Sequence, residues 1–361
     1  MELAMSIYVS NVDIDFSGVT FIPHQLSFPM RFLITGTAGF IGFHLAYRLL
    51  KDGHTVIGID GMSPYYDVSL KRARHTLLRQ MKNFICHEFF LEDTNTLNTV
   101  FKDAKPDVVI HLAAQAGVRY SIKNSRDYLD SNLVGTFNVM EAVRISQASH
   151  FMFASSSSVY SGNAQIPSSE KDNTPHPLTF YAATKKAGEV MTHSYSHLWK
   201  IPTTCLRFFT AYGPWGRPDM ALFKFVKNAI SREPIDIYGN GEMQRDFTYI
   251  DDLIEAVIHL IDKTPVQNKP VCEYDSLSPV APFRVVNIGA SKPISLLEFI
   301  NEIESALNIP IHRNMTEMLQ GDVIKTFANT DLLLALTGYH PNTPLNKGIH
   351  RFIEWYKERY V

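Results

Sequence analysis

The chain has 361 residues, 45% of them hydrophobic and 19% charged, which is enough for about two domains with a sizeable core. Its 34 Lys and Arg against 36 Asp and Glu give a formal net charge of −2, which argues against a nucleic-acid or membrane-surface protein, because such partners call for a basic excess. Three widely spaced cysteines and 14 scattered histidines indicate neither a disulfide framework nor a metal site, so we expect no metal and a reducing, cytoplasmic location.

Apolar runs of strand length alternate with helical stretches from Met30 onward. Short strands buried on both faces and separated by helices are typical of a parallel sheet wound in βαβ units. The sequence therefore predicts an α/β fold, with a doubly wound, Rossmann-type parallel sheet and a smaller, interleaved C-terminal α/β lobe. The expected strands are 31–35, 55–60, 83–87, 107–111, 151–155 and 203–208, and the expected helices are 39–50, 67–80, 125–147, 181–199, 250–262, 296–307 and 345–357.

Domain boundaries are expected where this alternation of strands and helices changes. Residues 1–29 precede the first periodic signal and lack the features of a signal peptide, and we assign them no function. Glycine and proline cluster beyond Phe208, which favours a second lobe that interleaves with the sheet. We assign residues 30–206, with about 246–264, to a nucleotide-binding domain, and residues 207–245 and 265–361 to a substrate lobe.

A glycine-rich turn follows the first expected strand and opens a helix. Gly36, Gly39 and Gly42 form the pattern G-x-x-G-x-x-G, which lets the backbone approach a pyrophosphate at a helix N-terminus. Asp60 ends the second strand, 24 residues after Gly36, where a carboxylate binds both ribose hydroxyls and repels a 2′-phosphate. The combination predicts NAD rather than NADP, although each feature alone also fits a tight turn or a surface carboxylate. Further expected cofactor contacts are Phe40, Ile41, Asp93 at the adenine amino group, and Leu112, Ala113 and Ala114 after the fourth strand.

A Tyr-x-x-x-Lys pattern opens the helix expected at 181–199. Tyr181 and Lys185 are one helical turn apart, about 6 Å along the axis, and share one face. Free tyrosine has a pKa of about 10. A neighbouring ammonium and a nicotinamide ring would lower that pKa, so that the tyrosine can act as a base. Ser156, just after the fifth strand, could hydrogen-bond the substrate oxygen whose proton Tyr181 takes.

Together these motifs resemble the extended short-chain dehydrogenases/reductases of the nucleotide-sugar epimerase and dehydratase group. The resemblance runs from Met30 to Val361 and includes the stretches 132–138, 207–214 and 244–252. More narrowly, the chain is similar to the UDP-glucuronate 4-epimerases in segments 116–121, 181–186 and 212–220, and in Thr210, where related enzymes commonly carry Asn. The resemblance implies that Asn132 belongs to the cofactor site and that Arg245 grips a nucleotide diphosphate.

The resemblance also implies transient oxidation at C4 of a UDP-sugar. Tyr181 would remove the proton of the 4-hydroxyl while C4 gives a hydride to NAD, and the keto sugar would turn and take the hydride back on its other face. Related dehydratases carry Asp-Glu after the hydroxyl residue and related decarboxylases carry a Glu nearby. Ser157 and Ser158 stand there in this chain, and neither has a useful acid–base pKa. Elimination is therefore disfavoured and epimerisation remains.

A glucuronate substrate carries a hazard, because its 4-keto form is a β-keto acid that loses CO2 when the carboxylate bond aligns with the carbonyl π system. We expect Ser157, Ser158 and Thr210 to hold the carboxylate away from that alignment. Arg217 would lie nearby, and Arg119 is an alternative carboxylate or phosphate partner. Each of these five side chains could instead satisfy only backbone groups or neighbouring carboxylates.

The leading hypothesis is an epimerase that interconverts UDP-glucuronate and UDP-galacturonate. One alternative is an epimerase for UDP-glucose or UDP-N-acetylglucosamine, which would leave Arg217 without a carboxylate; a dehydratase or decarboxylase is another. A third, from a different class, is a non-catalytic NAD-binding scaffold, whose signature would be loss of the pair Tyr181 and Lys185. The resemblance also implies a homodimer in which the helices expected at 125–147 and 181–199 form a four-helix bundle with a second copy.

Overall fold

The structure is a computed structural model, and it describes residues 26, 29–163, 165–318, 321 and 323–361. The extension predicted at 1–29 falls outside the described residues except at positions 26 and 29. Of these, Leu26 packs against the hydrophobic core beside Met30. No helix among the described residues is long and apolar enough to cross a membrane.

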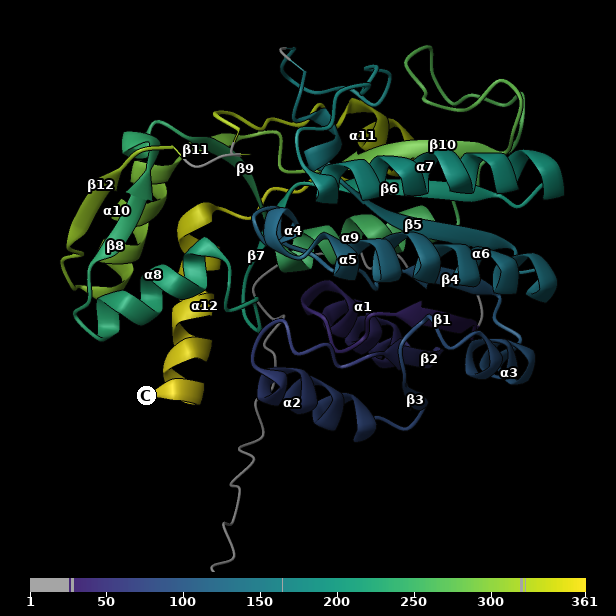
Figure 1. The fold of residues 1–361 in the computed structure, drawn as a ribbon, viewed down its shortest axis with the longest axis horizontal. Coiled ribbons are helices and arrows are strands. Elements are labelled where there is room, and N and C mark those ends of the chain that lie inside the picture. The colour runs from purple at the N-terminus through teal and green to yellow at the C-terminus, as the bar shows by residue number, and fades with distance from the viewer. Residues whose placement is uncertain (1–25, 27–28, 164, 319–320, 322) are drawn as a thin grey trace, which may run out of the picture.

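A seven-stranded parallel sheet forms the centre of the molecule (Figure 1). Its order, β10-β6-β5-β4-β1-β2-β3, reverses direction between β1 and β4, and ligands bind such sheets at the carboxyl ends of the strands beside this switch point. The prediction of a doubly wound sheet is confirmed, and the six expected strands agree to within one residue at either end. The strands are β1 (Arg31–Thr35), β2 (Thr55–Asp60), β3 (Phe84–Glu88), β4 (Val108–His111), β5 (His150–Ser156), β6 (Thr203–Phe208) and β10 (Phe283–Ile288).

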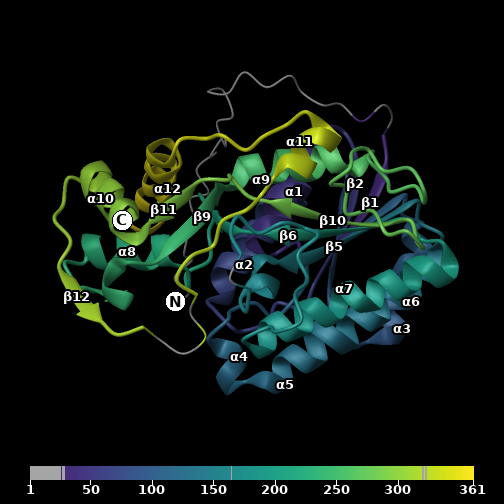
Figure 2. The same cartoon turned by 90° about the horizontal axis from the view of Figure 1, so that it is seen from above.

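Helices cover both faces of this sheet, and each face has its own hydrophobic core (Figure 2). The core on one side includes side chains of α3 (Thr94–Ala104) and α6 (Gly135–Ser146), beside α7 (Phe180–Trp199). The core on the other side is larger and continues without a break into the smaller lobe. The helices on that side are α1 (Phe40–Lys51), α2 (Val68–Arg79), α9 (Ile250–Ile261) and α11 (Asp331–Thr337).

The smaller lobe lies beside the sheet, at the left of Figures 1 and 2. Within the lobe, Phe247 stacks on Phe299, and the two ring centroids are 4.2 Å apart. Strand β10 pairs with β6, so residues 283–288 belong to the large sheet and not to the lobe to which we assigned 265–361. The lobe contains α8 (Ala221–Ile230), α10 (Leu296–Leu307), α12 (Leu345–Tyr360), the sheet of β11 (Pro293–Ser295), β9 (Gln244–Tyr249) and β7 (Thr210–Tyr212), and the sheet of β12 (Arg313–Thr316) and β8 (Ile235–Tyr238).

The helix expected at 125–147 is interrupted. Residues 125–146 form α5 (Ser125–Tyr128), a π-helical turn η1 (Leu129–Val134) and α6. Within that turn the Asn132 amide donates to the Gln115 carbonyl at 3.1 Å and to Thr184 Oγ1 at 3.0 Å, and its oxygen accepts from the Gln115 N–H at 2.8 Å. A π-turn leaves the apolar pattern nearly unchanged and often marks a functional site. The side chain of Asn132 therefore ties the segment after β4 to α7.

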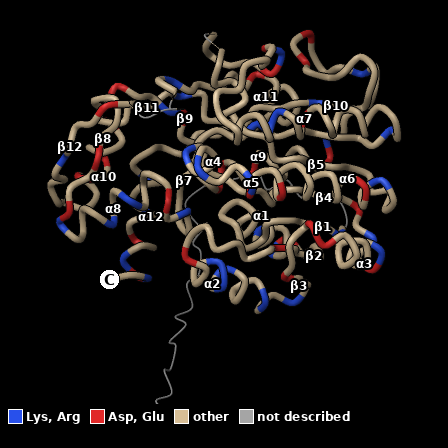
Figure 3. Tube along the Cα trace, in the orientation of Figure 1, with Lys and Arg blue, Asp and Glu red and all other residues tan. Residues whose placement is uncertain are grey.

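Short helical segments complete the chain: α4 (Tyr120–Lys123) and the 3₁₀ turns η2 (Ser157–Tyr160) and η3 (Gly239–Gly241). Basic and acidic residues are interspersed over the described elements (Figure 3). This distribution accords with the near-neutral charge and with the absence of a basic excess in the sequence.

Candidate active site

The glycine turn lies between β1 and α1 and faces the segment after β4. A Cβ atom added at Gly36 would lie 2.8 Å from the Ala113 nitrogen, and one at Gly42 would lie 2.1 Å from the Gly36 oxygen. Gly36 also has a φ of +83°, which side chains rarely adopt. Gly39 caps α1 without a side-chain hydrogen bond, so the first amides of the helix face the turn. This geometry fits a pyrophosphate at a helix N-terminus.

Asp60 ends β2 beside the glycine turn and is buried. Its two carboxylate oxygens accept hydrogen bonds from the backbone N–H groups of Ala38 and Met62, both at 2.9 Å. The carboxylate is thus fixed where the ribose of a dinucleotide would follow the pyrophosphate, and the described residues fit NAD. Of the other expected cofactor contacts, Phe40 and Ile41 begin α1, and residues 112–114 follow β4 directly.

Asp93 has a local role that the sequence analysis did not assign. It is exposed and caps α3, because its carboxylate accepts from the Thr96 N–H at 3.1 Å and from Thr96 Oγ1 at 2.6 Å. The residue follows β3, at the edge of the sheet next to β2. Its contact with the adenine amino group stays a prediction.

Tyr181 and Ser156 lie together at the carboxyl end of the sheet. Tyr181 occupies the first turn of α7, whose N-cap Thr179 accepts a hydrogen bond from the Ala182 N–H at 3.2 Å. Burial raises the pKa of Tyr181 above its usual value, while a hydrogen bond with Ser156 and the positive charge of Arg217 act in the opposite direction. The effect of burial on this pKa is the larger one, so the Tyr181 phenol is protonated at neutral pH.

Lys185 lies one turn further along α7 and is buried. Its ammonium donates to the Ala154 carbonyl at 2.8 Å, and burial lowers its pKa to about 8. We expected this ammonium to lower the pKa of Tyr181, but the groups that do so here are Ser156 and Arg217. The expectation was incomplete because it ignored the desolvation of both side chains. A further lowering of the tyrosine pKa then requires the positive charge of a bound nicotinamide ring.

The residues expected to bind a carboxylate lie on two segments of the chain, η2 and the stretch that starts at β7. Ser157 and Ser158 form the start of η2, where the Ser158 N–H donates to Ser156 Oγ at 3.1 Å. Thr210 is the first residue of β7 and lines a small apolar cavity together with Arg217. The charge of Arg217 acts on Tyr181, so the structure brings the two halves of the expected clamp to one site.

Arg217 is already paired. Its guanidinium donates to the Asp219 carboxylate at 3.0 and 2.6 Å, and the Tyr65 hydroxyl donates to the same carboxylate at 3.0 Å. Asp219 lies in the segment 212–220 that carries the resemblance, but no role in this site is predicted from the sequence for Asp219 or Tyr65. The pairing fixes the guanidinium while leaving it one more planar edge for an incoming anion.

Arg119 and Arg245 both contact the smaller lobe. The Arg119 guanidinium lies 4.4 Å from the ring centroid of Tyr238 in β8. Arg245 lies in β9 and donates to the carbonyls of Gln244 at 2.9 Å and Ile324 at 3.3 Å. Their predicted contacts with phosphate stay predictions.

Arg74 is a structural member of the site that sequence reasoning missed. It is fully buried in α2, and it donates to the Ala38 carbonyl of the glycine turn at 2.7 Å and to the Trp215 carbonyl at 2.5 Å. The side chain thereby joins the cofactor turn to the loop that carries Arg217. A lone arginine in a helix rich in basic residues indicates an exposed face, so no sequence pattern could have identified it.

Comparison with known proteins places this arrangement among related enzymes. Residues 32–272 match the NAD dependent epimerase/dehydratase family. The Rhizobium meliloti protein named "Probable UDP-glucuronate 4-epimerase" is 53% identical over 334 residues, which are 92% of this chain and 98% of that protein. UDP-glucuronate 4-epimerase 1 of Arabidopsis thaliana is 41% identical, over 91% of this chain and 77% of its own. The crystal structure of UDP-glucuronic acid 4-epimerase from Bacillus cereus with UDP-glucuronic acid and NAD matches with a TM-score of 0.82 and 32% identity, over 92% of this chain and 100% of its own.

Proposed function

The chain belongs to the NAD-dependent epimerase/dehydratase family, and we propose that it is a UDP-glucuronate 4-epimerase that interconverts UDP-glucuronate and UDP-galacturonate. The observation that carries the proposal is the hydrogen bond between Tyr181 and Ser156 at the end of β5, with the positive charge of Arg217 acting on the same phenol. Similarity to UDP-glucuronate 4-epimerases extends over nine tenths of the chain and supports the same substrate.

Each residue then has a definite task in the reaction. Gly36, Gly39 and Asp60 would hold NAD, which when bound accepts a hydride from C4 of the sugar and returns it. Tyr181 would remove the proton of the 4-hydroxyl, and Ser156 would hydrogen-bond the same oxygen. Lys185, one turn away, donates to the Ala154 carbonyl of β5. Ser156, Arg217 and a bound nicotinamide ring would support the tyrosine anion. Since the hydride returns to the other face of the same carbon, the net change is inversion at C4.

Whether the substrate keeps its carboxylate or loses it as CO2 would depend on Ser157, Ser158, Thr210 and Arg217. Hydroxyl groups hold an anion without supplying a strong proton donor to the enolate that decarboxylation would form. Arg217 adds positive charge from the other side of the site. In this proposal the clamp keeps the carboxylate bond out of line with the C4 carbonyl and so protects the β-keto acid.

Replacing Thr210 with Ala tests the clamp. We expect the variant to release CO2 and form a UDP-pentose as a side product, and to lose about 10-fold in kcat/KM, because one hydrogen bond to the carboxylate is worth about 1–1.5 kcal/mol. NMR of the products measures both effects. Thr204→Ala, at a buried hydroxyl within β6, is the matched control and should form no pentose. Unchanged epimerisation without CO2 release in Thr210→Ala would remove this residue from the clamp.

The substrate assignment is tested by incubating the purified protein with several UDP-sugars separately. We expect UDP-glucuronate to give UDP-galacturonate, and UDP-glucose and UDP-N-acetylglucosamine to react at least about 100-fold more slowly, because the clamp would face a neutral group. NMR of the C4 proton identifies which sugar inverts. Preferential inversion of a neutral sugar would contradict the proposal and favour the alternative epimerase.

A homodimer is part of the proposal. Phe137 and Ile145 are eight residues apart on α6, Val190 and Leu198 are eight apart on α7, and all four are exposed although apolar. Residues at this spacing share one helix face, and α6 and α7 pack side by side. A second copy of the chain would cover this surface with the same two helices.

Val190→Asp should shift the protein from dimer to monomer at micromolar concentration, because a carboxylate would be buried at the centre of the contact. Sedimentation equilibrium measures the mass against 40.9 kDa for one chain. Val266→Asp places the same charge at an exposed valine away from these helices and should leave the mass unchanged. A wild-type protein that sediments as a monomer would contradict the assignment.

A further inference from the structure

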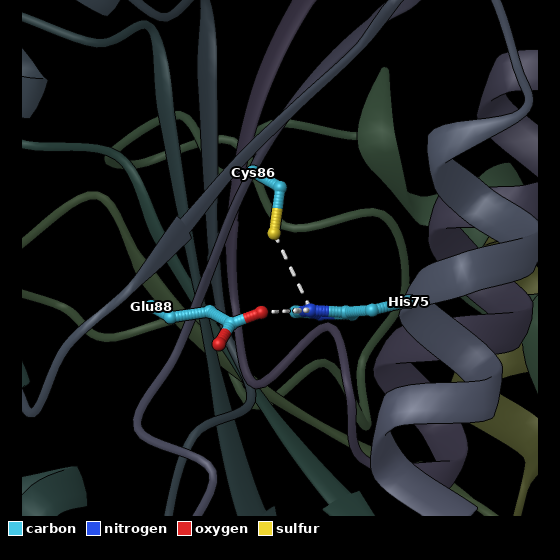
Figure 4. A group of neighbouring side chains, drawn as sticks. All are labelled: His75, Cys86 and Glu88. Atoms are coloured by element: carbon cyan, nitrogen blue, oxygen red, sulfur yellow. Dashed lines mark hydrogen bonds and ion pairs between the residues drawn. The ribbon is translucent and has the colours of Figure 1, made fainter. Parts of the chain in front are cut away.

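One side-chain cluster outside the site described above brings together three different metal-ligating groups (Figure 4). His75 projects from α2, and Cys86 and Glu88 project from the same face of edge strand β3, two residues apart. His75 Nδ1 lies 3.3 Å from Cys86 Sγ and 3.7 Å from Glu88 Oε1, and the three ligand atoms all lie within 4.8 Å of one another.

A hydrogen bond on the opposite side of its ring orients His75 toward Cys86 and Glu88. Its other ring nitrogen, Nε2, is hydrogen-bonded to Thr37 Oγ1 at 3.0 Å, inside the glycine turn. Gly58 in β2 leaves the room for this contact, because a Cβ there would lie 2.7 Å from Thr37 Oγ1. Histidines that bind metals are held in the same way, by a hydrogen bond on the nitrogen that faces away from the ion.

We propose that His75, Cys86 and Glu88 bind one zinc-class divalent cation, with water from the solvent side as the fourth ligand. Bond lengths of about 2.0–2.3 Å in a tetrahedral site place ligand atoms about 3.4–3.6 Å apart. The two separations from His75 Nδ1, 3.3 Å to Cys86 Sγ and 3.7 Å to Glu88 Oε1, lie within about 0.3 Å of these values. Rotation of the partly exposed Glu88 side chain closes the remaining gap to Cys86.

The donor set selects the kind of ion. One thiolate sulfur, one imidazole nitrogen and one carboxylate oxygen suit zinc or cobalt, whereas magnesium and calcium prefer all-oxygen sites. Metal binding would displace the Cys86 thiol proton, which leaves to solvent.

The positive charge of Arg79 would compete with a cation, because its guanidinium lies against two of the three ligands. Its guanidinium donates to Glu88 Oε1 at 2.5 Å and to Cys86 Sγ at 3.4 Å. The Arg79 side chain is 52% exposed, so it can return to water at little cost, because exposed ion pairs contribute little to stability. The arginine therefore competes with the ion and does not prevent its binding.

This cluster was missed in the sequence because the spacing His-x10-Cys-x-Glu joins a helix to a strand and matches no familiar metal motif. The expectation of no metal rested on the scattered histidines and the widely spaced cysteines. Metal binding, and not activity, is the quantity to measure, because His75 contacts Thr37 of the glycine turn and Glu88 lies opposite Asp60 in the sheet.

Cobalt binding by the full-length, untagged protein tests the proposal, because a thiolate–cobalt bond gives a charge-transfer band in the near ultraviolet. After chelator treatment, titration with CoCl2 should produce this band with one equivalent per chain. ZnCl2 should abolish the band stoichiometrically, and a large excess of MgCl2 should not. Absence of the band in the wild-type protein would overturn the proposal.

Four variants identify the ligands. Cys86→Ser and His75→Gln should each weaken zinc binding by at least about 100-fold, measured by competition with a chromophoric chelator. Cys272→Ser, at the other half-buried cysteine, should keep both the band and the affinity. Arg79→Ala keeps all three ligands and removes the competing cation, so it should bind zinc about 10-fold more tightly. A band that persists in Cys86→Ser, or that disappears in Arg79→Ala, would contradict the assignment even if another variant failed to fold.

Discussion

Tyr181→Phe is expected to lower kcat by about 10³-fold or more, within the 10²–10⁴-fold contributed by a general base, while the protein remains folded and retains NAD. The substitution removes only the hydroxyl that would take the substrate proton. Partly buried in the first turn of α7, the remaining ring keeps its edge-on contact with Tyr128, whose centroid is 6.1 Å away. Turnover is measured by NMR with UDP-glucuronate, and bound NAD by absorbance after denaturation.

Tyr195→Phe is the matched control for this experiment. Tyr195 lies on the same helix, 14 residues or about 21 Å further along, and its hydroxyl donates to Glu141. Removing this hydroxyl should change kcat less than 2-fold. Full activity in Tyr181→Phe would refute the proposed base and revive the alternative of a non-catalytic NAD-binding scaffold.

Much of the fold could be predicted from local patterns. The strands β1, β2 and β4 contain short apolar runs, and a short apolar run between two helical stretches is typical of a buried parallel strand. The glycine turn and Asp60 could be predicted as well, because the close approach of Gly36 to Ala113 tolerates no side chain.

Other features depend on contacts between distant segments, which single-sequence patterns do not show. The π-turn at Asn132 is stabilised by Gln115 and Thr184, which lie 17 and 52 residues away. Strand β10 joins β6 across an interval of about 75 residues, so its place in the large sheet could not be read from periodicity. The pKa of Tyr181 depends on burial and on Arg217, and both follow only from the assembled site.

Glu189→Gln is expected to lower the free energy of unfolding by about 3 kcal/mol, because breaking a buried ion pair leaves an uncompensated charge. Glu189 Oε1 accepts from Arg207 Nε at 2.8 Å and from Ser155 Oγ at 2.6 Å, and Oε2 accepts from Arg207 at 2.8 Å. The two side chains are only 3–4% exposed. Ser155 precedes Ser156, so the variant should also lose part of its activity. Urea unfolding, monitored by circular dichroism, measures the change.

Glu141→Gln is the matched control, because Glu141 pairs with Arg144 at 2.7 Å where both side chains are about one third exposed, and it should cost less than about 1 kcal/mol. An equal loss in the two variants would show that burial does not increase the contribution of the Glu189–Arg207 pair to the free energy of unfolding.

The stability loss in Glu189→Gln should also depend on pH. Burial alone would raise the pKa of Glu189, but the hydrogen bonds and charge of Arg207 outweigh it and hold the pKa below the ordinary value of 4.5. A carboxylate with a lowered pKa stabilises the folded state fully above its unfolded pKa, and this contribution disappears as the pH falls through the folded pKa. The difference between wild type and variant should therefore be constant from pH 6 to 8, about two units above the ordinary glutamate pKa, and should shrink in acid as the wild-type carboxyl takes up its proton. A difference that stayed the same in acid would mean that lost packing, and not lost charge, accounts for the destabilisation.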